Sequence, residues 1–172
     1  AAYHNIHGLK SVGLRFFTVY GPWGRPDMAV SLFTNKIENG ETITLFNGGE
    51  MWRDFTFVDD IVQGIELSME DCSDNAAVFN LGNSKPVKLG YFLEQIEKRL
   101  GIKAKFKYQA SNAEIKETYA DVSKAHELLG YQPTTSIESG LDQFMAWYKK
   151  LDKRTRDEWA GGRFKAGRMR RR

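Results

Sequence analysis

The spacing of apolar residues changes along the chain between the alternation of a strand and the three-to-four spacing of a helix. Apolar runs at 14–19 and 77–81 read as strands, which we expect in one sheet. Periodic apolar positions predict helices over Met28–Asn39, Leu89–Leu100 and 137–150. Strands and helices in this order predict an α/β fold, with the helices packed against the sheet.

Shorter elements are predicted between these. Thr42–Phe46 alternates as a strand, and Phe55–Val58 is a brief strand that leads into a further helix. Ala104–Tyr108 reads as an edge strand with lysines on its outer side, and Val122–Leu129 reads as a short helix. We expect the buried stripe of the helix after Val58 to consist of Ile61, Val62, Ile65 and Met69.

Capping residues predict where several helices begin and end. Asp27 is placed to cap the helix that starts at Met28, and Asp121 is placed to cap the short helix that follows it. Residues 135–138 read Thr-Ser-Ile-Glu, the pattern of a capping box, before the last helix. Residues 1–7 read as the last turn of a helix that ends at Gly8.

The composition of the chain changes towards its C-terminal end, where basic residues dominate. The chain has 172 residues and a formal net charge of +3, which suits one domain with a sizeable core. From Lys149 onward 11 Lys or Arg stand against 3 Asp or Glu, whereas the preceding part is mildly acidic. We therefore expect residues 1–151 to form the folded body and 152–172 to be a basic, disordered tail. Such a tail could touch nucleic acid through its phosphates, but a non-specific or vestigial role is favoured.

Cysteine content and hydropathy bear on location. Cys72 is the single cysteine, so an internal disulfide is excluded and a reducing cytoplasm fits. No apolar run reaches membrane-spanning length, and no signal peptide is recognised at the start. His4 and His7 have a spacing that suits metal ligands on a helix, but no third ligand is nearby, which argues against a metal site.

Candidate ligand-binding residues follow the first strand. Leu14–Met28 begins as that strand and then breaks at closely spaced glycines and a proline. The strand therefore delivers Thr18, Tyr20 and Arg25 to a loop at its carboxyl end, where ligands bind in open α/β sheets. Arg25 carries a planar fork of donors that suits a carboxylate or a phosphate.

A second candidate, Arg53, stands between aromatic residues just before the brief strand at 55–58. Its functional interpretation is contact with a phosphate group. The alternative interpretation is an ion pair with Asp54 or Asp59 at the start of the following helix.

Several of these segments resemble one enzyme family in order and spacing. The matching sequences are Thr-Val-Tyr-Gly-Pro at 18–22, Arg-Pro-Asp-Met at 25–28, Arg-Asp-Phe-x-x-Val-x-Asp at 53–60, Phe-Asn-Leu-Gly at 79–82 and Thr-Tyr-Ala-Asp at 118–121. From about Ala2 to Leu151 the chain resembles the extended short-chain dehydrogenase/reductase enzymes that act on nucleotide sugars. It is most similar to the UDP-glucuronate 4-epimerases. The length of the motif around Arg53 favours phosphate contact over the ion pair.

The resemblance implies a truncated Rossmann-like fold, in which C-terminal strands join a small α/β substrate-binding subdomain. It implies NAD as the cofactor of the full family and a UDP-sugar as the substrate. Arg53 would bind the diphosphate, and Phe46 lies on the strand beside the nucleotide base. The remaining substrate-binding candidates are Thr18 and Arg25 near the sugar carboxylate, Tyr20 in the same segment, and Glu114 at the ribose or a loop contact.

Two family motifs are absent from the sequence. No tyrosine is followed by lysine four positions later, and neither Gly-x-Gly-x-x-Gly nor Gly-x-x-Gly-x-x-Gly occurs. We therefore expect a substrate-binding half with no catalytic residue of its own, inactive alone, unable to bind NAD alone, and paired with a missing N-terminal half or a second copy. Leu14, Phe16 and Phe17 are candidates for its exposed apolar surface. The alternatives are a non-catalytic module that binds a nucleotide sugar or a partner, and part of a related UDP-sugar decarboxylase or dehydratase.

Overall fold

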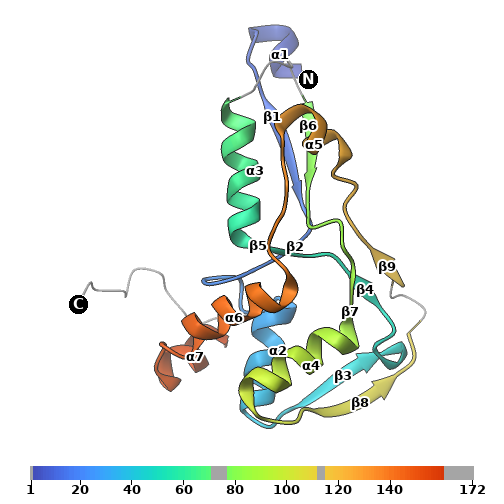
Figure 1. The fold of residues 1–172 in the computed structure, drawn as a ribbon, viewed down its shortest axis with the longest axis vertical. Coiled ribbons are helices and arrows are strands. Elements are labelled where there is room, and N and C mark those ends of the chain that lie inside the picture. The colour runs from blue at the N-terminus through green and yellow to red at the C-terminus, as the bar shows by residue number, and fades with distance from the viewer. Residues whose placement is uncertain (1, 71–76, 112–114, 161–172) are drawn as a thin grey trace.

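The computed structural model describes residues 2–70, 77–111 and 115–160, and Figure 1 shows its elements. The expectations for Cys72, for Glu114 and for 161–172 lie outside the described residues. The helices are α1 (Ala2–His7), α2 (Ala29–Glu38), the 3-10 turn η1 (Asn47–Gly49), α3 (Val58–Glu70), α4 (Leu89–Leu100), α5 (Ser123–Leu129), α6 (Ile137–Tyr148) and α7 (Lys153–Ala160). The strands are β1 (Val12–Phe16), β2 (Thr18–Tyr20), β3 (Thr42–Phe46), β4 (Trp52–Arg53), β5 (Phe55–Phe57), β6 (Ala77–Leu81), β7 (Val87–Lys88), β8 (Lys105–Gln109) and β9 (Glu117–Thr118).

β1 and β6 form a parallel pair, so the start of the run predicted at 14–19 and the run at 77–81 share a sheet, as expected. The register places Val12 opposite Ala77 at one end and Phe16 opposite Leu81 at the other. One face of this pair is covered by α3 and α5, and side chains of both helices and both strands form an apolar cluster between them. The α/β prediction is thus confirmed.

A second and larger apolar core lies among the remaining strands and α2, α4, α6 and α7. β2 pairs in parallel with β5, β3 pairs in parallel with β8, and β4 lies between β7 and β9. Phe55 of β5 stacks on Phe92 of α4 with 4.1 Å between the ring centroids. Because β2 follows β1 directly and β5 leads into α3, the β2–β5 pair joins the two cores (Figure 1).

The predicted strand 14–19 divides at Phe17. The Phe17 N–H donates to the Leu81 carbonyl at 3.1 Å, and β2 begins at the next residue. β1 pairs with β6 whereas β2 pairs with β5, so the chain changes partners across a single residue. The apolar pattern does not encode this change, because both halves favour a strand.

The buried face of α3 differs from the predicted stripe. Ile61 is buried as expected, but Val62 and Met69 are 43% and 76% exposed. A Cβ built at Gly64 would lie 2.6 Å from Leu81 Cδ1, so the helix approaches the sheet most closely at this glycine. That approach sets which side of α3 faces inward, and the polar residues Asp60 and Ser68 lie on it.

Two helix starts are close to the predicted positions. At α6 the capping residue is Ser136 rather than Thr135, because the Ser136 hydroxyl accepts from the Ser139 N–H at 3.2 Å. α5 begins at Ser123, and the residue at its capping position is Val122 rather than the predicted Asp121. The Asp121 carboxylate still accepts a hydrogen bond from the Ser123 N–H at 3.0 Å.

The disorder expected after Leu151 is wrong for Lys153–Ala160, which forms α7. Trp159 is only 5% exposed and belongs to the same apolar core as the end of α6. Arg156 forms an ion pair with Glu38 of α2. The basic composition of this segment therefore did not indicate that the buried Trp159 ring and the Arg156–Glu38 ion pair hold the helix against the rest of the fold.

The apolar surface expected at Leu14, Phe16 and Phe17 is smaller than predicted. Phe16 is 50% exposed, but Leu14 and Phe17 are partly buried. Leu14 packs against the cluster beneath α3, because it alternates along β1 with the exposed Gly13 and Arg15.

Candidate functional site

The loop between β2 and α2 carries the first group of predicted site residues. It follows the carboxyl end of β2 and borders an open pocket of about 560 Å³. Aromatic and aliphatic side chains dominate its lining, and Arg25 is the charged residue among them. The chief contributors are Phe16, Phe17, Val19, Trp23, Met28 and Val58. The loop at which the sequence placed ligand-binding residues therefore borders a space large enough for a small ligand.

Tyr20 and Thr18 lie on β2 just before this loop. Tyr20 is 3% exposed, and its ring packs edge-on against Phe57 at 5.5 Å. Its hydroxyl lies 3.5 Å from the Ser136 carbonyl oxygen and closely faces Gly140, where any Cβ would collide with it. Burial raises the pKa of Tyr20 above its ordinary value, so the hydroxyl stays protonated. The Tyr20 side chain thus packs in the core, whereas Thr18 is only partly buried.

Arg25 points its donor fork at Asp27. Its Nε and one terminal nitrogen donate to the two carboxylate oxygens at 3.1 and 2.5 Å. The expected cap of α2 by Asp27 is therefore wrong, and Met28, which precedes the helix, makes no side-chain capping bond. The hydrogen bonds from Arg25 hold the pKa of Asp27 below its ordinary value. A ligand carboxylate could take the place of Asp27 at this fork.

Arg53 lies at the other end of the β2–β5 pair. β4 places it opposite Thr118 of β9 on one side and Val87 of β7 on the other. The guanidinium donates to the Trp52 carbonyl at 2.8 Å and contacts the Met51 sulfur at 3.7 Å. These contacts hold the side chain against its own strand.

Phe46 ends β3 near a cross-link between two loops. The Asn47 side chain donates to the Ser111 carbonyl at 2.8 Å, and the Ser111 N–H donates back to the Asn47 side chain at 2.9 Å. This pair of hydrogen bonds ties the end of β3 to the segment that leads towards Glu114, which lies outside the described residues.

Asp54, beside Arg53, has a role that sequence reasoning missed. It is 1% exposed, and its carboxylate accepts backbone N–H bonds from Asn83, Ser84 and Ala120 at 2.8, 2.9 and 2.9 Å. The Thr56 hydroxyl donates a further bond at 3.2 Å. These contacts give no support to the interpretation of Asp54 as an ion-pair partner. Only an acidic residue inside an apolar segment signals this role in the sequence.

The two predicted arginines therefore occupy different ends of one strand pair. Thr18 lies opposite Phe55 in the parallel register, so Arg53 precedes the pair and Arg25 follows it. Figure 1 shows β4 on one side of the pair and the loop after β2 on the other. The structure brings Arg53 close to β7 and β9, and it does not bring Arg25 to the same place.

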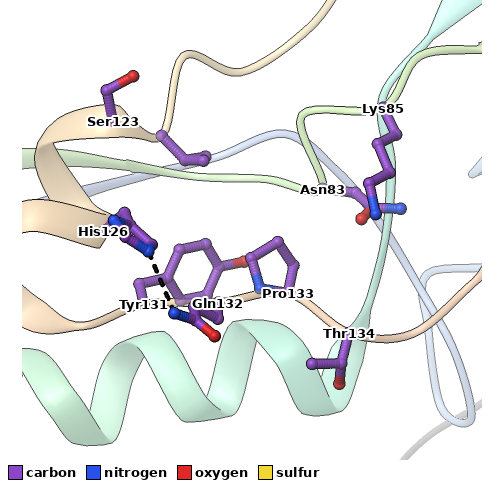
Figure 2. A pocket seen from close by; sticks show the side chains of 9 residues that line it. Asn83, Lys85, Ser123, His126, Tyr131, Gln132, Pro133 and Thr134 are labelled. Carbon is purple, nitrogen blue, oxygen red and sulfur yellow. Dashed lines mark hydrogen bonds between the residues drawn. The ribbon is translucent and has the colours of Figure 1, made fainter.

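A second pocket, of about 490 Å³, lies beside α5 and contains none of the predicted residues. Figure 2 shows His126 and Gln132 joined by a hydrogen bond of 3.1 Å, with Asn83 and Lys85 across the space from them. Tyr131 forms its floor and donates to the Gly82 carbonyl at 3.0 Å, and burial raises the pKa of this hydroxyl. Its polar groups come from distant segments, so the sequence pattern gave no signal of it.

The described parts of the chain contain neither a cluster of metal-ligating side chains nor a helix that could span a membrane. Within residues 2–70, 77–111 and 115–160, no three His, Cys, Asp or Glu side chains gather as metal ligands. None of the helices in these ranges combines the length and the apolar character that a membrane span requires.

Comparisons with known proteins agree on one family. Residues 1–82 match the model of the NAD dependent epimerase/dehydratase family. The uncharacterized protein MJ1055 of Methanocaldococcus jannaschii is 50% identical over 85% of this chain and 45% of its own length. UDP-glucuronate 4-epimerase 1 of Arabidopsis thaliana is 42% identical over 85% of this chain and 38% of its own length.

A solved structure supports the same relationship. The crystal structure of UDP-glucuronic acid 4-epimerase from Bacillus cereus, in complex with UDP-glucuronic acid and NAD, is 35% identical to this chain with a TM-score of 0.78. The match covers 88% of this chain and 49% of that one. The chain thus spans about two fifths to one half of the length of the curated relatives it matches. The resemblance to the nucleotide-sugar epimerases is confirmed for the part of those proteins that this chain spans, and its residues 1–82 match the NAD dependent epimerase/dehydratase family.

Proposed function

We propose that this chain is the nucleotide-sugar-binding part of a UDP-sugar 4-epimerase, and that its ligand is UDP-glucuronate. The observation that carries the proposal is Arg53, a planar donor fork fixed on a strand between two others, within the motif shared with the epimerases. The similarity to UDP-glucuronate 4-epimerases over 85% of the chain supports the choice of sugar.

In this proposal each end of the β2–β5 pair contacts a different part of the ligand. Arg53 binds the diphosphate, Phe46 lies against the base, and Glu114 contacts the ribose or its loop. Thr18 and Arg25 bind the sugar carboxylate, which requires Arg25 to exchange Asp27 for the ligand. Tyr20 supports the loop from the core and makes no side-chain contact with the ligand.

NAD appears with the Bacillus cereus epimerase, but the residues of this chain do not fit an NAD diphosphate site. Such a site needs a glycine-rich turn that opens directly into a helix N-terminus. The loop after β2 instead carries Trp23, Arg25 and Pro26, and the sequence holds no glycine fingerprint. We therefore propose that the isolated chain does not bind NAD, and we assign no chemical step to it.

A second candidate function is a non-catalytic module that binds a nucleotide sugar. The absence of a Tyr-x-x-x-Lys pair favours it for the isolated chain, since proton abstraction requires a positioned base. We expect no conversion of UDP-glucuronate by the isolated chain, with or without NAD, when products are separated by chromatography. Epimerised product from a contaminant-free preparation would overturn the assignment of these residues to binding alone.

Calorimetry with UDP and UDP-glucuronate tests the binding roles. Arg53→Ala should weaken binding of both ligands by about 1.5–3 kcal/mol, the range of a hydrogen bond to a charged group. Arg53→Lys should recover only part, because an ammonium cannot reproduce the bidentate fork. Arg25→Ala should spare UDP and weaken UDP-glucuronate.

Arg154→Ala is the matched control. It removes an exposed guanidinium on α7 and changes the net charge of the chain by the same amount as Arg53→Ala and Arg25→Ala. It should leave both affinities unchanged. Failure of the wild-type chain to bind either ligand would refute the proposal for this chain. Equal losses of both ligands in the Arg53 and Arg25 variants would refute the separate roles.

A further inference from the structure

The loop after β2 contains a strained aromatic residue. Trp23 has a φ of 63°, in the left-handed region that bulky residues rarely adopt. The residue is 48% exposed, so burial alone does not hold it. A residue in this conformation persists only where its surroundings fix it.

The Trp23 ring packs on α6. It meets the Trp147 ring edge-on, with 5.1 Å between centroids and 65° between planes. Trp147 also contacts Phe144 of the buried core at 5.6 Å. Edge-to-face pairs at these separations are attractive beyond the area that they bury. The contact with Trp147 therefore stabilises the unusual backbone of the loop.

Trp147 is in turn supported from α7. Trp159 meets it edge-on at 5.5 Å and 78°, and lies 6.5 Å from the Tyr148 ring. Trp23, Trp147 and Trp159 thus form a continuous row of three rings, which we call the tryptophan row. It runs from the loop to the last helix that the structure describes.

α7 depends on a few contacts for its position. An eight-residue helix is too short to be stable alone, and Trp159 is its one buried residue. Arg156 pairs with Glu38 of α2 and lies over the Tyr148 ring at 5.1 Å, while the Tyr148 hydroxyl donates to the same carboxylate at 2.8 Å. Loss of Trp159 or Arg156 should therefore loosen the helix and uncover one side of Trp147, although the Lys153 ammonium also donates to the Asn39 side chain at 3.0 Å.

We propose that α7 is a positioning element for the loop after β2, acting through the tryptophan row. The loop is the one that the proposed function assigns to the sugar carboxylate, so the consequence for affinity rests on that function. The structural part does not, because it concerns only the three rings. A segment whose sequence reads as a basic tail thereby sets the conformation of the loop after β2, since Trp159 lies 136 positions after Trp23.

Fluorine NMR of the chain labelled with 5-fluorotryptophan tests the structural part. The sequence has four tryptophans, so four resonances are expected, and single Trp→Phe variants assign them. Trp159→Ala should shift the resonances of Trp147 and Trp23 and leave that of Trp52, on β4, in place. A shift of Trp147 without Trp23 would overturn the proposal.

A pair of arginines on α7 supplies a matched comparison that leaves every ring intact. Arg156→Ala removes the anchor on Glu38 and should shift Trp23 in the same direction as Trp159→Ala. Arg154→Ala removes a guanidinium whose side chain is 82% exposed, and it should shift none of the three rings. An equal change of the Trp23 resonance in both arginine variants would contradict the proposal that α7 acts through the tryptophan row. These variants keep the test decisive even where Trp159→Ala unfolds the chain and moves Trp52 as well.

Affinity supplies the second readout. Trp159→Ala should weaken binding of UDP-glucuronate by about threefold to tenfold, the equivalent of one aromatic pair, and leave UDP unchanged. Trp159→Phe, which keeps a ring at this position, should recover most of the loss. An equal loss for UDP would show a general defect and overturn the positioning role. A wild-type chain that binds neither ligand would refute the proposed function, while the fluorine spectra would still decide the role of α7.

Discussion

The two arginine-bearing ends of the β2–β5 pair are built from different kinds of contact. Before the pair, the buried Asp54 accepts three backbone N–H bonds from segments distant in sequence. After the pair, Arg25 and Asp27 join on the surface, with side chains 75% and 62% exposed, and Trp23 holds a left-handed backbone. Buried hydrogen bonds to a charged group fix one geometry, whereas exposed pairs exchange readily with water.

This difference suggests a division of labour within the proposed site. A diphosphate is common to all UDP-sugars, so a preorganised arginine suits it. The sugar varies between ligands, and the exposed Arg25–Asp27 pair on this loop can exchange for a sugar group at small energetic cost. The next three predictions test whether the first end is as rigid, and the second as adjustable, as the contacts indicate.

Asp54→Ala should have the largest effect. It leaves three buried N–H groups without an acceptor, and we expect the free energy of unfolding to fall by about 3–5 kcal/mol. Urea denaturation followed by circular dichroism measures the loss. Asp59→Ala is the control, because Asp59 is exposed in the first turn of α3 and should cost less than about 1 kcal/mol. Similar unfolding midpoints for both variants would contradict the view that the buried hydrogen bonds of Asp54 fix the Arg53 end of the strand pair.

Gly82→Ala should have an intermediate effect. A Cβ there would collide with Ala120 and lie 2.9 Å from an Asp54 carboxylate oxygen, so the segments around Asp54 must move apart. We expect a loss of about 1–3 kcal/mol in thermal unfolding. Gly90→Ala, in α4 where a Cβ meets nothing within 4 Å, should instead stabilise by about 0.5–1 kcal/mol. A neutral Gly82→Ala would show that these segments have room to adjust.

The smallest effect concerns the titration of Asp27. Hydrogen bonds from Arg25 lower its pKa in the folded chain, so the pair stabilises the fold above the ordinary carboxyl pKa. This contribution is lost as the pH falls through the lowered value. Because both side chains are exposed, the urea midpoint should hardly change with it. In a carboxyl-carbon NMR titration, Arg25→Ala should return Asp27 to the ordinary range, and Arg154→Ala should not. An unmoved titration in Arg25→Ala would show that the pair does not form in solution.

Local signals predicted the regular elements well. Leu89–Leu100 has the predicted bounds, because its apolar spacing is clear and Gly101 takes a left-handed conformation with a φ of 71°. The final helix buries Ile137, Leu141 and Phe144 as expected from their period. In both cases the information lies within one helix and its immediate neighbours.

Contacts between distant segments escaped the same reasoning. The carboxylate of Asp54 is satisfied by backbone groups, which carry no residue-specific pattern. The sequence placed Tyr20 beside the loop after β2 but did not show that its side chain packs against Gly140 in the core. α7 read as a tail because Trp159 is one apolar residue in a basic segment, and contacts with distant helices, among them the Trp147 and Tyr148 rings of α6, make it buried. Among the candidate residues, position along a strand was predictable, but the direction of the side chain was not.

The Asp54 carboxylate also bears on how long the folded state lasts. Its three backbone bonds close sequence separations of 29, 30 and 66 residues. Closing separations of this size costs chain entropy before any bond forms, so we expect local helices to form earlier and these bonds to form after the folding barrier. Loss of an interaction made after the barrier accelerates unfolding and hardly slows refolding. In stopped-flow measurements Asp54→Ala should therefore raise the unfolding rate constant and hardly change the refolding rate constant. One buried carboxylate thereby prolongs the lifetime of the proposed diphosphate site.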